Sequence, residues 1–114
     1  MTNPKSSDPL FREVALVGVG LIGGSLALAA RKAGLVGRVV GIDTDGGHRE
    51  MALASGMVDR VSDRVTGDLS AADLVVLAVP VTAITGLLPE VARHANENCQ
   101  VTDVGSEGAH PGGR

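Results

Sequence analysis

The chain has 114 residues, a net charge of −3, 44% hydrophobic residues and only 1% aromatic residues. This length predicts one domain, with a core built from Val, Leu, Ile and Ala. The acidic balance and the scarcity of aromatic residues argue against a nucleic-acid-binding surface, and no apolar run is long enough to span a membrane. Since the first residues carry no signal-peptide pattern, we expect a cytoplasmic protein.

Patterns typical of strands and helices alternate along the chain after a polar lead-in over residues 1–12, which we expect to be disordered. Gly34 and Gly56 stand where the first two helices would end. Pro80 is expected to end the fourth strand, and Pro89 to kink or divide the third helix. The alternation predicts an α/β fold with a parallel sheet, followed by an unstructured tail over residues 107–114. The expected strands cover residues 14–17, 38–42, 58–65 and 74–80, with a last strand that starts at Cys99 and ends near Asp103. The expected helices cover residues 21–33, 47–55 and 81–94.

Three glycines are spaced Gly18-x-Gly20-x-x-Gly23 at the junction between the first strand and the first helix. In a dinucleotide-binding turn the first glycine permits the tight turn, the second leaves room for a pyrophosphate, and the third lets the helix lie close to the strand. The N–H groups of the first helical turn then face the phosphates. The pattern predicts a dinucleotide site, and the alternative is a glycine-rich turn without a ligand.

Asp43 stands at the end of the second expected strand, at the distance beyond Gly23 where dinucleotide-binding folds carry an acidic residue. A carboxylate at this position accepts both ribose hydroxyls of the adenosine half and repels a 2′-phosphate. The cofactor that this arrangement favours is NAD. NADP is less favoured but stays open, because Arg49 lies a few residues downstream.

Four segments of the chain resemble the prephenate dehydrogenase family, which includes arogenate dehydrogenases. They are VGVGLIGGSLALAAR at 17–31, ALASGMVD at 52–59, ADLVVLAVPV at 72–81 and VTDVGS at 101–106. The likeness extends over residues 13–106, which we expect to form one dinucleotide-binding domain with a Rossmann-like, doubly wound parallel sheet. Dehydrogenases of the hydroxyisobutyrate dehydrogenase and pyrroline-carboxylate reductase types are similar in fold but share fewer of these segments.

The family resemblance implies an oxidative decarboxylation in tyrosine biosynthesis, in which a hydride passes from the substrate to the nicotinamide. It also implies that Ser106, in the VTDVGS segment, is a catalytic residue close to the substrate hydroxyl and the nicotinamide. By the same likeness, the residues expected to bind NAD are Gly18, Gly20, Leu21, Ile22, Gly23, Asp43, Val79 and Pro80.

Beyond Ser106 the sequence departs from the family pattern, and the helical second domain is expected to be missing. That domain shapes the substrate pocket and forms the dimer in the family, so prephenate or arogenate would bind only with it present. His110-Pro111 follows Ser106 too closely to replace the family's catalytic histidine, and neither His48 nor His94 is placed to act as a base. No histidine has metal-ligand spacing, so no metal is expected.

The sequence therefore predicts a truncated family member that is inactive alone, produced by a frameshift, an early stop or a deliberate boundary. Three alternatives remain open. The chain is a free-standing nucleotide-binding module, one subunit of a split enzyme, or a marginally folded remnant that binds nothing. The face left bare by the missing domain is expected to cause self-association.

Overall fold

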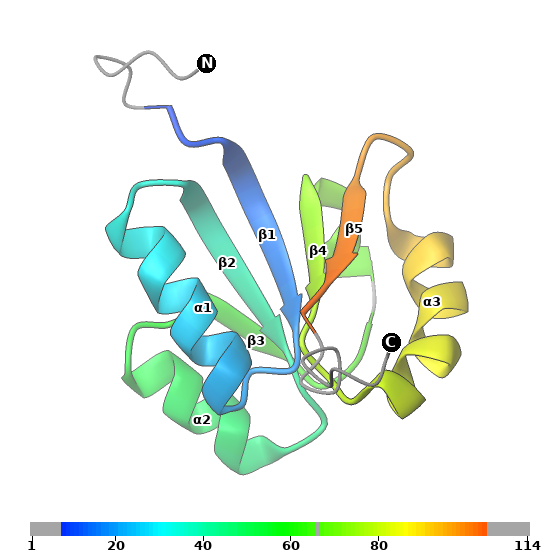
Figure 1. The fold of residues 1–114 in the computed structure, drawn as a ribbon, viewed down its shortest axis with the longest axis horizontal. Helices are drawn as coiled ribbons and strands as arrows, with labels where there is room; N and C mark the ends of the chain where they lie inside the picture. The colour runs from blue at the N-terminus through cyan, green and yellow to red at the C-terminus, as the bar shows by residue number, and fades with distance from the viewer. Residues whose placement is uncertain (1–7, 66, 105–114) are drawn as a thin grey trace, which may run out of the picture.

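In a computed structural model, which describes residues 8–65 and 67–104, the described residues form one five-stranded parallel sheet with helices on both faces (Figure 1). The strand order is β3-β2-β1-β4-β5. The strands are β1 (Phe11–Val17), β2 (Val36–Ile42), β3 (Arg60–Ser62), β4 (Leu74–Leu77) and β5 (Gln100–Asp103). The helices are α1 (Leu21–Lys32), α2 (Gly46–Ala54) and α3 (Val81–His94), with a short 3-10 helix, η1 (Gly67–Ala71), before β4.

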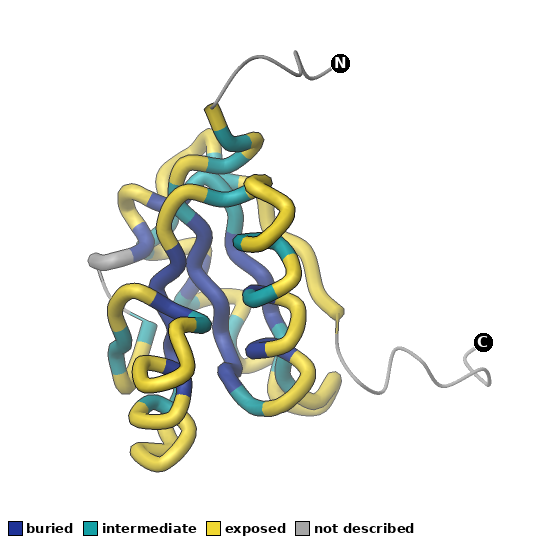
Figure 2. Tube along the Cα trace, turned by 90° about the vertical axis from the view of Figure 1, so that its left-hand side faces the viewer, coloured by how far each residue is buried: buried dark blue, intermediate teal, exposed yellow. Residues whose placement is uncertain are grey.

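The sheet separates two apolar cores, one on each face. Alternate residues of β1 point in opposite directions, so Val14 and Leu16 pack with Ala27 of α1. Ala15 and Val17 pack on the other face with Val91 of α3. Figure 2 shows the buried strands enclosed between more exposed helices. Both faces of the sheet are covered at residues 14–17 of β1, which explains why these four residues are all apolar rather than alternating in polarity.

The chain reverses its direction across the sheet at β1. It first runs outward from β1 to β2 and β3, and then returns to place β4 on the other side of β1, with β5 beyond it. α1 and α2 consequently lie on one face and α3 on the opposite face (Figure 1). This is the predicted doubly wound α/β arrangement, in which ligands bind outside the carboxyl ends of the strands where the order reverses.

The predicted helix ends at Gly34 and Gly56 are confirmed. Their φ angles are 74° and 75°, the left-handed conformation that glycine adopts most readily after a helix. The Leu35 N–H donates to the Ala30 carbonyl oxygen at 3.0 Å, closing the last turn of α1. Pro89 lies inside one continuous α3, so the helix is not divided into two pieces.

Two strand predictions are wrong at their ends. The third strand was expected over residues 58–65, but only Arg60–Ser62 pair with β2. Val58 is instead buried beneath the helices, and the segment after Ser62 leaves the sheet at its carboxyl edge. β4 ends at Leu77 because its partner β1 ends at Val17, and Pro80 is the N-cap of α3 rather than the end of a strand.

The first strand begins at Phe11, three residues before the expected start, so the end of the expected lead-in belongs to the sheet. Phe11 is in register with Val36 of β2, and the Arg12 N–H donates to the Asp73 carboxylate at 2.6 Å. These partners lie far along the chain, so the local sequence gives no sign of them. Within the described residues, no helix has both the length and the apolar composition needed to cross a membrane.

Candidate functional site

The turn between β1 and α1 requires glycine at two positions for internal reasons. Gly18 has a φ of 96°, and a Cβ atom there would collide with the carbonyl oxygen of Ala78. A Cβ atom on Gly23 would overlap the carbonyl oxygen of Gly18 and lie 3.1 Å from the Cβ of Ala78. The tight turn expected at Gly18 and the close helix approach expected at Gly23 are therefore confirmed.

Gly20, the middle glycine, has no such internal reason. It is the N-cap of α1, and an added Cβ would meet only the Cε1 atom of His48 at 3.8 Å, an ordinary contact. No side chain caps this end of α1, and its first turn carries no acidic residue. The first N–H groups of a helix have no partner within the helix, so this open end can receive an anion such as a pyrophosphate.

Asp43 follows β2 directly and ties this turn to the rest of the sheet edge. Its Oδ2 atom accepts the Val19 N–H at 3.0 Å and lies 3.1 Å from Nδ1 of His48. Its Oδ1 atom accepts the Asp45 N–H at 2.9 Å. Burial of the carboxylate opposes its ionisation, but the hydrogen bonds from Asp45, Val19 and His48 together outweigh it and lower the pKa of Asp43 below its ordinary value.

Two contacts of Asp43 were not expected from the sequence, one between the His48 ring and its carboxylate and one between Arg49 and its backbone carbonyl oxygen. Asp45 is the N-cap of α2 and accepts the His48 N–H at 2.9 Å, which turns the His48 side chain back toward Asp43. Arg49 donates from Nη1 to the backbone carbonyl oxygen of Asp43 at 2.7 Å. An aspartate followed three residues later by a histidine is the signal that could have indicated this capped turn.

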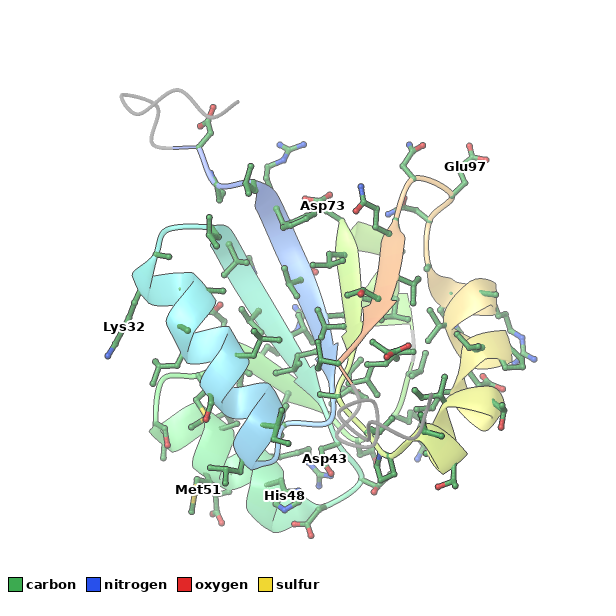
Figure 3. The ribbon with its side chains drawn as sticks, viewed as in Figure 1. Lys32, Asp43, His48, Met51, Asp73 and Glu97 are labelled. Carbon is green, nitrogen blue, oxygen red and sulfur yellow. The ribbon has the colours of Figure 1, made fainter. Side chains whose placement is uncertain are left out.

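A cleft of about 610 Å³ opens at the carboxyl edge of the sheet, beside the glycine turn. Gly18, Asp43 and Val79 all line it, although they come from three different parts of the chain. Figure 3 shows Asp43 and His48 at the end of the sheet where α1 begins. The remaining lining residues are Val17, Ile42, Thr44, Asp63, Arg64, Val65, Ala83, Gly86, Leu87 and Glu90.

Three other expected site residues, Leu21, Ile22 and Pro80, do not line this cleft. Leu21 and Ile22 are on the first turn of α1, with exposed fractions of 83% and 52%, and Pro80 is exposed at the start of α3. Ser106 lies outside the described residues, as does His110. Among the residues that the structure describes, no three His, Cys, Asp or Glu side chains are grouped so that they could hold a metal ion.

The doubly wound sheet, the glycine turn and the acidic residue after β2 together define a dinucleotide-binding α/β domain. Comparison with known families agrees with this class. Residues 26–111 match the family described as prephenate dehydrogenase, nucleotide-binding domain. The chain belongs to the prephenate dehydrogenase family. The matched segment begins inside α1, so it does not include the glycine turn.

Individual relatives cover more of the chain. A prephenate dehydrogenase of Bacillus subtilis is 37% identical over 94 residues, which are 82% of this chain and 25% of that protein. The structure of prephenate dehydrogenase from A. aeolicus with hydroxyphenyl propionate and NAD+ superposes with a TM-score of 0.78 at 31% identity, over 83% of this chain and 34% of that one. Synechocystis arogenate dehydrogenase gives a TM-score of 0.74 at 29% identity, over 81% of this chain and 32% of that one. The chain therefore spans about a quarter to a third of the length of these relatives.

Proposed function

We propose that this chain binds NAD as the cofactor-binding domain of a prephenate or arogenate dehydrogenase. The observation that carries the proposal is the glycine turn, in which Gly18 and Gly23 are required by packing while Gly20 is not. Because a side chain at Gly20 would disturb nothing inside the protein, the glycine there is best explained by a ligand that approaches the backbone. The relative that superposes with bound NAD+ supports the choice of cofactor.

The residues around the turn would each contact a different part of the cofactor. The first N–H groups of α1, at Leu21 and Ile22, face the pyrophosphate, and the Asp43 carboxylate accepts a ribose hydroxyl of the adenosine half. The apolar part of the cleft would take the adenine ring, and the chain from Val79 to Pro80 would lead toward the nicotinamide. The places of Asp43 and Val79 in the cleft, and the open start of α1, support these assignments.

NAD is preferred over NADP in this proposal. The lowered pKa of Asp43 keeps its carboxylate ionised at neutral pH, and the negative charge repels a 2′-phosphate. Arg49, the nearest arginine downstream of Asp43, already donates to the Asp43 carbonyl oxygen, which reduces its availability for that phosphate.

The chemical step belongs to the longer family members. NAD supplies the hydride acceptor when it is bound, and the hydroxyl of Ser106 would hydrogen-bond the reacting hydroxyl of prephenate or arogenate and orient it. The substrate pocket and the dimer contacts would come from a second domain, so this chain alone is proposed to bind NAD in the cytoplasm without turning over substrate. The family name of the relatives and their greater length support this division.

Calorimetric titration of the chain with NAD and NADP tests the proposal. We expect NAD to bind more tightly, and Asp43→Asn to weaken NAD by about tenfold or more because charge-assisted hydrogen bonds are lost. Glu97→Gln is the matched control, since Glu97 is an exposed carboxylate at the opposite end of the sheet (Figure 3). A folded chain that binds neither nucleotide would refute the proposal, and an unchanged NAD to NADP ratio in Asp43→Asn would remove Asp43 from its role.

A further inference from the structure

We infer that His48 occupies one of the positions on Asp43 that the adenosine ribose needs, so NAD must displace the His48 ring in order to bind with both ribose hydroxyls. This inference rests on the proposed NAD site. It concerns a residue that the glycine pattern and the acidic position do not include. The consequence is that His48 weakens NAD binding although it lies within the site.

The hydrogen bonds already made by Asp43 leave too little room for two more. An ionised carboxylate has about four acceptor positions and no donor. Oδ1 uses one of them for the Asp45 N–H, and Oδ2 uses two, for the Val19 N–H at 3.0 Å and for Nδ1 of His48 at 3.1 Å. One position remains, on Oδ1, whereas a ribose with its 2′- and 3′-hydroxyls needs two.

Of these three donors, only the His48 ring can leave without disturbing the backbone. The Val19 and Asp45 donors are backbone N–H groups that hold the glycine turn and the start of α2. The His48 side chain is 51% exposed, while its own N–H remains fixed to the Asp45 carboxylate. Rotation of the side chain therefore frees a position on Oδ2 and leaves α2 capped.

The ring lies between Asp43 and the start of α1. Its Nδ1 is hydrogen-bonded to Asp43, and its Cε1 lies 3.8 Å from the Cβ position of Gly20. The ring thus acts as an internal substitute for the ribose hydroxyl. It holds the carboxylate in place in the free protein and competes with the ligand for it.

The test measures the Kd of NAD and of its 2′-deoxyadenosine analogue for the wild-type chain and two variants. His48→Ala removes the donor and the ring, while His48→Phe keeps the bulk and removes only the donor. We expect the Kd of NAD to fall about two- to fivefold in both variants, the range for releasing one half-exposed side-chain hydrogen bond. The analogue should show no such gain, since its single remaining hydroxyl fits the free position on Oδ1.

His94→Ala is the matched control, because His94 ends α3 at the opposite edge of the sheet and pairs with Glu90 at 4.0 Å. Its Kd for NAD should equal that of the wild type. An unchanged or higher Kd in His48→Ala, an equal gain for both nucleotides, or a gain in His48→Ala that is absent in His48→Phe would each overturn the inference. These results differ from failure of the proposed function, in which the wild-type chain itself does not bind NAD.

Discussion

Replacing glycines of the β1–α1 turn one at a time separates the demands of folding from those of cofactor binding. In Gly23→Ala the new methyl group collides with the carbonyl oxygen of Gly18 and presses on the Cβ of Ala78 at 3.1 Å. In Gly20→Ala the methyl group meets only His48 at an ordinary distance of 3.8 Å, and the φ of −70° at Gly20 suits alanine. We therefore expect Gly23→Ala to destabilise the fold, and Gly20→Ala to spare the fold but impair NAD binding.

The sizes of the two effects follow from these contacts. Forcing a methyl group against rigid backbone costs about 1–3 kcal/mol, and the better helix propensity of alanine offsets at most about 1 kcal/mol of that. Because the Gly23 methyl group would overlap a backbone oxygen, its cost falls in the upper part of this range, about 2–3 kcal/mol, and the net loss is about 1–2 kcal/mol. This loss lowers Tm on the order of 5–15 °C for a domain of this size. Gly24→Ala is the matched control, since its methyl group would meet the flexible thioether of Met57, which can move aside.

Urea denaturation and NAD titration of the three variants provide the assay. Gly20→Ala should retain most of the wild-type unfolding free energy and lose about tenfold or more in NAD affinity, because its methyl group blocks the approach of the pyrophosphate. Gly24→Ala should be close to the wild type in stability. The reasoning fails if Gly20→Ala unfolds as readily as Gly23→Ala, or if Gly20→Ala binds NAD as well as the wild-type chain.

Three further predictions concern stability and association. The Asp59 carboxylate accepts hydrogen bonds from Nη1 and Nη2 of Arg31, at 2.7 and 3.1 Å, and from the Val39 N–H at 2.8 Å. Asp59→Asn should therefore lower the unfolding free energy measured in urea by about 1–2 kcal/mol. The Arg31 side chain lowers the pKa of Asp59, and the pKa of Asp43 is also lowered, so the unfolded chain binds more protons in acid. The stabilisation by these two carboxylates should be complete above the ordinary carboxyl pKa of about 4, and it should be lost as the pH falls through their lowered pKa values in the folded protein. A urea midpoint that stays constant from neutral pH to about pH 3 would contradict this. An apolar groove of about 220 Å³ is lined by Leu26, itself 42% exposed, so we expect concentration-dependent association in sedimentation experiments, reduced in Leu26→Lys; a monomer at every concentration would count against it.

The order of elements could be predicted from the sequence because each one carries its own local signal. The apolar run at 14–17 and the glycines at 34 and 56 act through the residues beside them, and the structure agrees with them. Strand ends were less predictable, since a strand continues only where a neighbouring strand can hydrogen-bond to it. Residues 58–65 carry valines at 58, 61 and 65 between polar residues, yet β3 covers only Arg60–Ser62 and ends where β2 ends, at the Ile42–Ser62 pair.

In the site, too, the sequence predicts where the residues lie but not what they contact. The spacing of Gly18, Gly20 and Gly23 places the turn correctly, but it does not show that the three glycines have different roles. Only the surrounding atoms distinguish them, since Ala78 and the Gly18 carbonyl oxygen forbid side chains at two positions and leave the third open. A glycine that packing does not require is the more informative sign of a ligand, because the fold alone gives no reason for it.

Asp43 illustrates why an expected binding residue need not be free to bind. The sequence places it at the end of β2, where its carboxylate was assigned to ribose hydroxyls alone. In the folded chain the same carboxylate holds Val19 in the glycine turn and Asp45 at the start of α2. The glycine turn and the proposed cofactor site therefore share one side chain. Losing Asp43 would loosen the glycine turn as well as remove the proposed ribose contact, whereas His48 can leave the carboxylate and keep the turn intact. The proposed preference for NAD would accordingly depend on the whole Asp43 hydrogen-bond network and not on the acidic residue alone.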